Sequence, residues 1–556
     1  MRRYRLAPLF FVFFLAFNAH AESPDQAAVA SAHPAATEAG LAILAEGGNA
    51  FDAAVAVSAA LAVVEPYSSG LGGGGFFLLR QAGEPATYRF LDARERAPLS
   101  STANLYRRQG KVERDLSLNG ALAAAIPGLP AALVAVSERY GTLPLPQTLA
   151  PAIRLARNGF AVDRVYRERA QYRLAALRDD PESARLFLHD GEVPEEGFIV
   201  RQPDLADTLE AIAQRGHDGF YSGERAARMI NAVRNAGGIW EAEDLELYRT
   251  VEREPLRYTL DEERTLITAP PPSAGGIALA QSLGMLRHLP WQHTNRLQRS
   301  HYIIEALRRA YRDRGVLGDP DFVEIPTADL LSETYLARLA SNIDPAQATP
   351  SKDLPPAPGW TEGDHTTHFT VIDKRGRAVA ATLSINLPFG AAFTAAGTGV
   401  LLNNEMDDFA ADVEGANAYG LSGSQANAIS AGKRPLSSMS PTFIESDEAF
   451  ASFGTPGGSR IPSMVLLAIM EYLQGHPVEA WVSTPRYHHQ YLPDIVEYEP
   501  GAFSRDDERQ MEGRGYQMKA LARPYGNQHV LLWDKESSKV QAASDPRGVG
   551  AAQVRD

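Results

Sequence analysis

The pattern of apolar positions predicts two consecutive helices near the start of the chain. They occupy residues 35–64 and are separated by Gly47-Gly48-Asn49. The second, residues 53–64, is apolar on nearly every side. A helix of that kind is expected to be buried. Farther along, residues 120–237 and 276–315 also have mainly helical patterns.

A strand pattern begins abruptly at residue 366. Residues 368–373 and 378–384 read as two strands joined by a turn at residues 374–377, which is typical of a hairpin. This hairpin places Thr366 at the open end of its first strand. The remaining pattern is mostly strands, with a helix at residues 461–474 and a final hairpin near residues 529–543.

Helices therefore flank strand-rich blocks at both ends of the chain, because residues 76–79 and 86–93 also read as strands. This arrangement is typical of stacked helical and sheet layers. We expect one compact unit rather than separate domains.

The proline-rich residues 345–363 read as a loop that leads directly to Thr366. An exposed loop of this kind is expected where a chain is to be cut.

Composition narrows the possible functions. The net charge of −14 argues against binding nucleic acid by bulk electrostatics. The chain has no cysteine, so neither disulfides nor thiolate chemistry are available to it. No apolar run outside the first 21 residues is long enough to suggest a membrane span.

Residues 1–21 have the pattern of a secretory signal peptide. Three arginines precede the apolar residues 6–17, and Ala19-His20-Ala21 forms a cleavage site with small residues at both ends. The apolar stretch is too short to span a bilayer, although a membrane anchor is the alternative interpretation. We expect an exported protein that is located in a bacterial periplasm and not bound to a membrane.

Glycines at positions 70, 72 and 75 match the GxGxxG pattern of dinucleotide-binding proteins. That pattern must follow a strand and open a helix. Here it follows a helix and precedes the strand at residues 76–79, so we reject a dinucleotide site. We expect instead a turn in which the backbone packs closely.

Gly363-Asp364-His365-Thr366-Thr367-His368-Phe369-Thr370 is a candidate for catalytic chemistry. A threonine can act as a nucleophile when its own α-amino group is its base. That amine is free only if the chain is cut between His365 and Thr366. Taken alone, this segment also fits the start of an ordinary strand, because β-branched residues favour strands.

Three further segments, residues 401–409, 434–442 and 454–460, carry polar residues beside glycine turns or apolar strands. Together with the threonine segment they resemble the γ-glutamyltranspeptidases (glutathione hydrolases), which are N-terminal-nucleophile hydrolases. The similarity begins near Gln26 and continues to the end of the chain. It is carried, in order, by residues 33–75, 127–128, 271–276, 317–320, 366–373, 403–409, 435–442, 454–458 and 485–493.

The resemblance implies an α+β fold, a four-layer αββα sandwich. It also implies self-cleavage into a large subunit, residues 22–365, and a small subunit, residues 366–556, that stay together. The implied reaction transfers the γ-glutamyl group of glutathione or other γ-glutamyl compounds to water or to amino acid or dipeptide acceptors. No cofactor and no metal are implied.

The resemblance also assigns roles to individual residues. Thr366 is the implied nucleophile, and Ser384 stands where most members have a second threonine that supports the Thr366 amine. Backbone N–H groups of Gly457 and Gly458 form the implied oxyanion hole. The substrate α-carboxylate is assigned to Arg94, Ser437 and Ser438, and the α-ammonium to Asn386, Glu405 and Asp408.

Two of these positions have special features. Glu405 stands where some members have glutamine, which adds a negative charge to the site. Tyr419 matches the tyrosine of a lid loop, residues 412–431, that in the family closes onto the position of Asn386. Loop closure of this kind excludes water and orients the substrate.

Each assigned residue also fits an ordinary structural role when taken singly. Arg94 fits a strand-end ion pair, Asp408 the start of a helix, the two serines a polar loop, and the two glycines a simple turn. Their order along the chain favours the catalytic interpretation. The adjacent His488 and His489 raise the possibility of a metal site, but no HExxH motif or His/carboxylate triad accompanies them.

Two rival functions remain. One is a related acylase for cephalosporin-type side chains, with the same nucleophile and a different specificity pocket. The other is a non-catalytic periplasmic binding protein built on the same fold. Retention of Arg94, Asp408 and the two serines argues against the first, and Thr366 with Gly457-Gly458 argues against the second.

Overall fold

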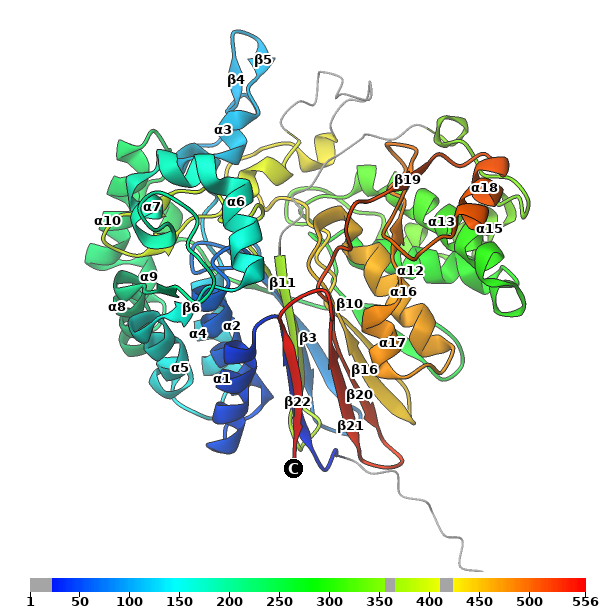
Figure 1. Cartoon of the computed structure of the whole chain (residues 1–556), viewed down its shortest axis with the longest axis horizontal. Coiled ribbons are helices and arrows are strands. Elements are labelled where there is room, and N and C mark those ends of the chain that lie inside the picture. Colours follow the sequence, from blue (N-terminus) through cyan, green and yellow to red (C-terminus); the bar gives the residue numbers. More distant parts are fainter. Residues whose placement is uncertain (1–22, 356–365, 411–423) are drawn as a thin grey trace, which may run out of the picture.

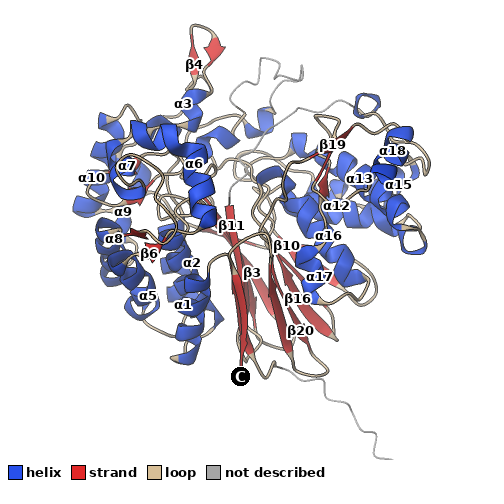
Figure 2. Ribbon diagram, viewed as in Figure 1, coloured by secondary structure: helices blue, strands red, loops and turns tan. Residues whose placement is uncertain are grey.

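Two antiparallel sheets lie face to face at the centre of the molecule, and helices cover the outer face of each (Figures 1 and 2). The computed structural model describes residues 23–355, 366–410 and 424–556. This arrangement of layers matches the predicted αββα sandwich.

The first sheet has seven strands and the second has six. In spatial order, the first contains β22 (Ala551–Arg555), β1 (Ala27–Ser31), β11 (Thr366–Ile372), β12 (Ala378–Ser384), β2 (Gly74–Gln81), β3 (Thr87–Ala93) and β8 (Val251–Arg253). The second contains β21 (Val540–Ser544), β20 (His529–Asp534), β16 (Ala449–Phe453), β15 (Thr442–Glu445), β10 (Thr265–Thr268) and β9 (Leu256–Thr259).

Each outer face is covered by its own set of helices (Figure 2). On the first sheet lie α1 (Pro34–Ala45), α2 (Ala50–Val64), α4 (Leu129–Tyr140), α5 (Leu145–Asn158), α6 (Arg164–Asp179), α8 (Pro203–Arg215) and α10 (Gly223–Asn235). On the second lie α12 (Gly275–Arg287), α13 (Arg296–Asp313), α15 (Glu333–Ser341), α16 (Ile461–Leu473), α17 (Val478–Ser483) and α18 (Arg505–Gly513).

The core follows from alternation along the central strands. In β2, Phe77 and Leu79 pack in the cluster that contains the helices of the first layer, whereas Phe76 and Leu78 pack in the cluster between the sheets. Successive side chains of a strand point to opposite faces, so a strand buried on both sides is apolar throughout. The sheets also meet through a hydrogen bond of 2.7 Å between Thr370 Oγ1 and Ser452 Oγ.

The predicted early helices and the hairpin are confirmed. Every residue of α2 is buried, and its first turn is closed by a capping box between Asn49 and Asp52. Strands β11 and β12 pair along their whole length, with Thr366 opposite Ser384. The helix at 461–473 and the final hairpin of β20 and β21 also form where the pattern places them.

Both sheets combine strands from before and after residue 366. In the first sheet β11 lies between β1 and β12, and β12 pairs with β2. In the second sheet β10 pairs with β15. The segments on either side of residue 366 therefore form one interleaved core rather than two domains.

The glycine-rich turn before β2 is a close-packed structural element. A Cβ added at Gly72 would lie 2.0 Å from the carbonyl oxygen of Leu401, and one at Gly73 would lie 2.1 Å from that of Ser384. No side chain fits at such distances. This confirms the predicted close approach and places the turn directly against the end of β12.

Among the residues that the structure describes, no helix is both long enough and apolar enough to cross a bilayer.

Candidate active site

Thr366 is the first residue of β11, which lies between β1 and β12 in the first sheet, near the centre of the molecule (Figure 1). Only 6% of its surface is exposed. Its Oγ1 accepts a hydrogen bond from the backbone N–H of Gly457 at 3.3 Å. Ser384 lies directly opposite on β12, so both hydroxyl side chains share one face of the sheet.

The turn that carries Gly457 and Gly458 joins β16 to α16. Both residues have positive φ angles, +136° and +53°, which L side chains adopt only with strain. A sequence of two glycines is therefore needed here to bring backbone N–H groups toward Thr366. Backbone N–H groups held in this way can stabilise an oxyanion on a substrate bonded to Thr366.

Arg94 follows the end of β3 and is the centre of a buried ion cluster. Its Nη1 lies 2.6 Å from Glu405 Oε2 and 3.5 Å from Glu95 Oε2, and its Nη2 lies 2.5 Å from Asp408 Oδ2. Glu405 and Asp408 are the ends of a short 3₁₀ helix, Glu405–Asp408. We call Arg94, Glu95, Glu405 and Asp408 the Arg94 cluster.

The Arg94 cluster has three carboxyl groups for one guanidinium. Burial raises the pKa of Glu95 to about 7, although Arg94 opposes the change. Burial also raises the pKa of Glu405, with Arg94 opposing it and Glu95 adding to it. Ser384 forms a hydrogen bond with Glu405, so the cluster connects to the residue opposite Thr366. An acid-rich, buried cluster close to Thr366 is suited to a cationic ligand.

Ser437 and Ser438 lie on a loop that passes over the Arg94 guanidinium. Arg94 Nε donates to the carbonyl of Pro435 at 3.2 Å. Ser438 Oγ accepts a hydrogen bond of 3.0 Å from Arg314, and Ser437 Oγ accepts one of 3.1 Å from the N–H of Met439. Both serines are fully buried. The structure thus brings the predicted carboxylate-binding residues together.

Asn386 and Asn427, which lies in the described part of the predicted lid, surround the same region. Asn386 has a φ of +72° and donates from Nδ2 to the carbonyl of Asn404 at 2.9 Å. Asn427 donates to the carbonyl of Asp408 at 2.7 Å and accepts from the N–H of Leu436 at 3.0 Å. Tyr419 and His365 lie outside the described residues.

Comparison with known proteins identifies the family. The family model for γ-glutamyltranspeptidase matches residues 36–554. The chain belongs to the γ-glutamyltranspeptidase family. It is 40% identical over 515 residues to a glutathione hydrolase proenzyme of Pseudomonas sp. (strain A14), covering 90% of this chain and 88% of the relative.

Two solved structures support the fold. A cephalosporin acylase from Bacillus halodurans aligns with a TM-score of 0.85 at 26% identity, over 99% of each chain. The γ-glutamyltranspeptidase of Helicobacter pylori aligns with a TM-score of 0.57 at 37% identity, over 59% of this chain and 94% of that one. The predicted family and its α+β sandwich are therefore confirmed.

The structure adds residues to this γ-glutamyltranspeptidase site that the sequence did not reveal. Glu95 follows Arg94 directly in the sequence, but its burial becomes visible only in the fold. Glu65, after α2, accepts a hydrogen bond of 2.7 Å from Thr367 Oγ1, and burial raises its pKa to about 7. Arg314, at the end of α13, reaches Ser438 from a distant part of the chain. Adjacency to Arg94 is the only sequence signal, and it applies only to Glu95.

His488 and His489 are buried and hydrogen-bonded to protein groups. His488 Nδ1 lies 2.9 Å from Ser463 Oγ, and His489 Nε2 lies 3.1 Å from Asp494 Oδ1. Burial lowers the pKa of His489 to about 4. Among the described residues, no group of three or more acidic, histidine or cysteine side chains is arranged to hold a metal ion.

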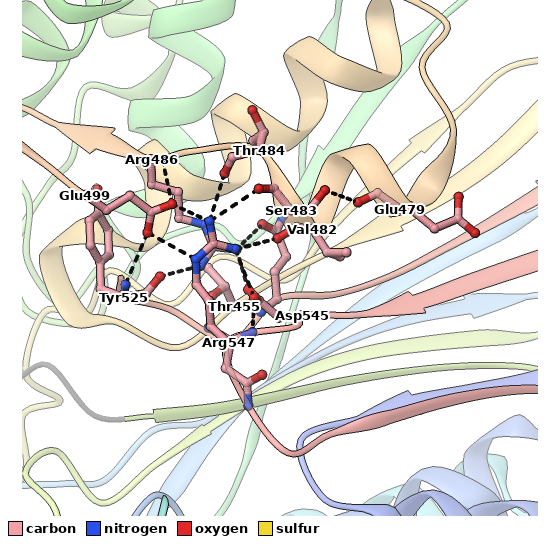
Figure 3. Close-up of polar contacts among 12 residues, drawn as sticks. Thr455, Glu479, Val482, Ser483, Thr484, Arg486, Glu499, Tyr525, Asp545 and Arg547 are labelled. Atoms are coloured by element: carbon pink, nitrogen blue, oxygen red, sulfur yellow. Dashed lines mark hydrogen bonds and ion pairs between the residues drawn. The ribbon is translucent and has the colours of Figure 1, made fainter. Parts of the chain in front are cut away.

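A second buried ion cluster joins the last strands to the helices of the second layer (Figure 3). Arg486 pairs with Asp545, and Arg547 pairs with Glu499 and, at 3.0 Å, with Asp545. Arg486 also donates its backbone N–H to Glu499 at 3.0 Å. We call Arg486, Glu499, Asp545 and Arg547 the Arg486 cluster.

Proposed function

We propose that this protein is a self-processing γ-glutamyltransferase that cleaves glutathione and other γ-glutamyl compounds. The observation that carries the proposal is the position of Thr366. It begins a strand, contacts the Gly457 N–H, and lies opposite the serine that hydrogen-bonds to the Arg94 cluster. A nucleophile, an oxyanion donor and an acid-rich recognition site thus meet at one strand end.

In the proposed maturation, Thr366 Oγ1 attacks the carbonyl carbon of His365. The peptide C–N bond breaks, the Thr366 nitrogen takes up a proton, and an ester remains until water hydrolyses it. This separates residues 22–365 from residues 366–556. The new α-amino group has a reference pKa of about 7.7–8.0, so it can act as a base near neutral pH.

In the proposed catalytic cycle, the Thr366 amine accepts the hydroxyl proton as Oγ1 attacks the γ-carbonyl of the substrate. The tetrahedral oxyanion is placed at the N–H groups of Gly457 and Gly458, and loss of one such donor typically costs about 10²–10³ in rate. The amine then gives its proton to the departing nitrogen, which is that of Cys-Gly when glutathione is the donor. Water or an acceptor amine finally cleaves the γ-glutamyl ester.

Recognition of the donor is proposed to exchange ion pairs within the Arg94 cluster. Asp408, with Glu405 and Asn386, would pair with the α-ammonium of the substrate. Arg94 would then turn its released N–H groups to the α-carboxylate, assisted by Ser437 and Ser438. Arg is suited to this role because its planar fork binds a carboxylate through two parallel hydrogen bonds. Tyr419 is proposed to close over the bound donor.

We also propose export to the periplasm, followed by removal of residues 1–21. The basic start, the apolar core and the Ala19-His20-Ala21 site support this location. Large and small subunits would then remain together, because their strands alternate in both sheets.

The decisive experiment compares the wild type with Thr366→Ala. The wild type should give two bands on a denaturing gel and should release Cys-Gly from glutathione. With glycylglycine present, it should also form the γ-glutamyl product. The variant should stay a single chain without activity, as shown by intact-mass analysis. Efficient cleavage after His365 in the variant would contradict the assignment.

The same assay separates the rivals. A cephalosporin-type acylase would mature but would leave glutathione intact while hydrolysing a glutaryl or related side-chain amide. A binding protein would remain uncut and would retain the ligand. The fold is common to the acylase neighbour and to the γ-glutamyltranspeptidases, so only the substrate test discriminates between these two enzyme classes.

A further inference from the structure

The backbone donors of the proposed oxyanion hole lie in a turn that has little rigidity of its own. We call residues 454–460, which join β16 to α16, the Gly457 turn. Glycine is the least restricted residue, and this turn has two of them in succession. A Cβ added at Gly457 would lie 2.5 Å from Met464 Cε, so a stiffer residue does not fit there. The direction of the N–H groups must therefore be imposed by the residues around the turn.

Ser459 directly follows the two glycines, and two of its polar groups are held by distant residues. It lies in the 3₁₀ turn Gly458–Arg460. Its carbonyl oxygen accepts a hydrogen bond from the hydroxyl of Tyr311. Its own hydroxyl donates to Gln490 Oε1 at 2.8 Å. Because Ser459 is buried, both bonds form in surroundings of low dielectric, where a hydrogen bond is strong.

The two partners of Ser459 are themselves fixed by further contacts. The ring of Tyr311 packs edge-on against the ring of His488, with centroids 5.4 Å apart. Gln490 Oε1 also lies 3.0 Å from His488 Nε2, and Gln490 Nε2 donates to the carbonyl of Leu492 at 3.1 Å.

His488 can donate to Gln490 from one nitrogen only. Burial lowers the pKa of His488 to about 3, so its imidazole is neutral and carries a single N–H. The Gln490 oxygen is an acceptor, which places that N–H on Nε2. Gln490 Oε1 is therefore held by His488 on one side and by Ser459 on the other.

The contacts to Ser459 come from both sides of the proposed cut. Tyr311 is on α13, in the predicted large subunit, whereas the Gly457 turn and Gln490 belong to the predicted small subunit. The turn is thus held between a helix of one subunit and a segment of the other.

We propose that Tyr311 and Gln490 are positioning residues for the γ-glutamyl transfer proposed above, on which this inference rests. Through Ser459 they keep the backbone donors of the Gly457 turn aimed at the oxyanion that forms on Thr366. Such donors help most when their direction is set before the reaction. A loosened turn should therefore destabilise the transition state more than the bound substrate.

The first test removes one hydroxyl group. Tyr311→Phe keeps the ring against His488 and loses the bond to Ser459. With γ-glutamyl-p-nitroanilide as donor, we expect kcat to fall about fivefold to twentyfold and KM to change by less than about twofold. An unchanged kcat would overturn the proposal. A wild type that is folded but inactive toward every γ-glutamyl compound would instead count against the proposed function.

Tyr516→Phe is the matched control. The Tyr516 hydroxyl lies 2.7 Å from His301 Nδ1 and donates to Glu305 Oε1 at 3.1 Å, so both of its partners are on α13 rather than in the Gly457 turn. This variant should lose thermal stability about as Tyr311→Phe does, while kcat and KM stay at their wild-type values. An equal fall in kcat would show that kcat follows general stability, and would overturn the proposal.

The second test separates the transition state from the ground state. A boronic acid analogue of glutamate can form a tetrahedral anion on Thr366, whereas glutamate binds without such a bond. Tyr311→Phe should weaken inhibition by the boronic acid about as much as it lowers kcat, and should leave inhibition by glutamate unchanged. Equal weakening of both inhibitors would indicate a distorted donor site and would refute a positioning role.

Gln490 is tested through the hydrogen bond that it shares with Ser459. Gln490→Met and Ser459→Ala each remove this bond and should each lower kcat about threefold to tenfold. The double variant should be no worse than either single variant, because both substitutions remove the same bond. Gln490→Glu keeps the accepting oxygen and should retain most of the activity. Multiplied losses in the double variant, or a Gln490→Glu enzyme as poor as Gln490→Met, would contradict the proposal.

Discussion

The Arg94 cluster and the Arg486 cluster use the same groups with different charge balance. Both are largely buried, with only Arg547 partly exposed among their members, and both join segments that are distant in sequence. The Arg94 cluster has one guanidinium and three carboxyl groups, whereas the Arg486 cluster has two of each (Figure 3). The first is therefore acid-rich and the second is balanced.

The titration of the two clusters reflects this difference. Burial raises the pKa of Glu95 to about 7, because the single positive charge of Arg94 does not offset the cost of burying this carboxylate. In the Arg486 cluster, burial alone would raise the pKa of Asp545. The positive charges of Arg486 and Arg547 outweigh that effect and lower the pKa. A balanced buried cluster can serve the fold alone. An acid-rich one can accept a cationic ligand, which agrees with the proposed binding of the α-ammonium of a γ-glutamyl donor.

The largest expected effect on stability comes from breaking the balanced cluster. Asp545→Asn leaves a buried excess of positive charge on Arg486 and Arg547. We expect the free energy of unfolding to fall by about 3–5 kcal/mol, measured by denaturant titration. Asp506→Asn, in an exposed ion pair with Arg509, is the control and should change it by less than about 0.5 kcal/mol. A small effect of Asp545→Asn would remove the distinction between the clusters.

The largest expected effect on activity comes from the acid-rich cluster. Asp408→Ala should lower kcat/KM for γ-glutamyl substrates about 10²–10³-fold, because the α-ammonium loses its partner. Self-cleavage should remain, since maturation involves no glutamyl ammonium. A donor analogue without the α-amino group should be poor for the wild type and much less penalised in the variant. Simple addition of the two penalties would show that Asp408 does not contact the ammonium.

A smaller loss of kcat/KM is expected from a substitution of Arg94 that keeps the positive charge but removes the planar guanidinium. Arg94→Lys should reduce kcat/KM about 10–100-fold, mainly through KM, because lysine lacks the planar fork. The two-subunit pattern on a denaturing gel should persist. Unchanged kinetics would mean that Arg94 only neutralises its neighbours, as Arg486 does in the balanced cluster.

A further test of the comparison uses pH. The folded pKa of Glu95, about 7, lies above its unfolded value near 4.5. The folded state therefore retains a proton that the unfolded state releases between these values. Stability should fall by about 1.4 kcal/mol per pH unit over this window as pH rises.

A matched pair of substitutions tests that pH effect. Glu95→Gln should remove the decrease in the free energy of unfolding that Glu95 causes. The variant should therefore gain stability relative to the wild type as pH rises from about 4.5 to about 7. Glu499→Gln, in the balanced cluster, should instead lower stability because Arg547 loses a partner. Thermal unfolding followed across this pH range gives both results. Parallel behaviour of the two variants would contradict the contrast in charge balance.

The sequence predicted the elements whose signal is local. Helix α2 is apolar on all sides, and the hairpin of β11 and β12 has a short polar turn, so neither depends on distant contacts for recognition. The glycine turn was also correctly interpreted, because GxGxxG before a strand contradicts the nucleotide-binding arrangement. Family motifs then indicated the residues around Thr366.

The pairing among these residues could not be predicted. Arg94 and Asp408 are separated by more than three hundred positions, and only the assembled fold brings their side chains to 2.5 Å. The same applies to Arg314 at Ser438 and to Glu65 at Thr367. Burial sets the pKa of Glu65 and Glu95, and burial is a property of the assembled layers rather than of local sequence.

The alternation of strands across residue 366 has a consequence for folding order. Before the cut, the strands of both sheets belong to one chain, and their assembly is independent of concentration. After the cut, unfolding would release two chains whose strands must find each other again, which makes refolding bimolecular. The proposed cut would thus make the lifetime of the folded protein depend on its unfolding rate rather than on a reversible folding equilibrium. Folding would therefore have to be complete before the proposed cut is made.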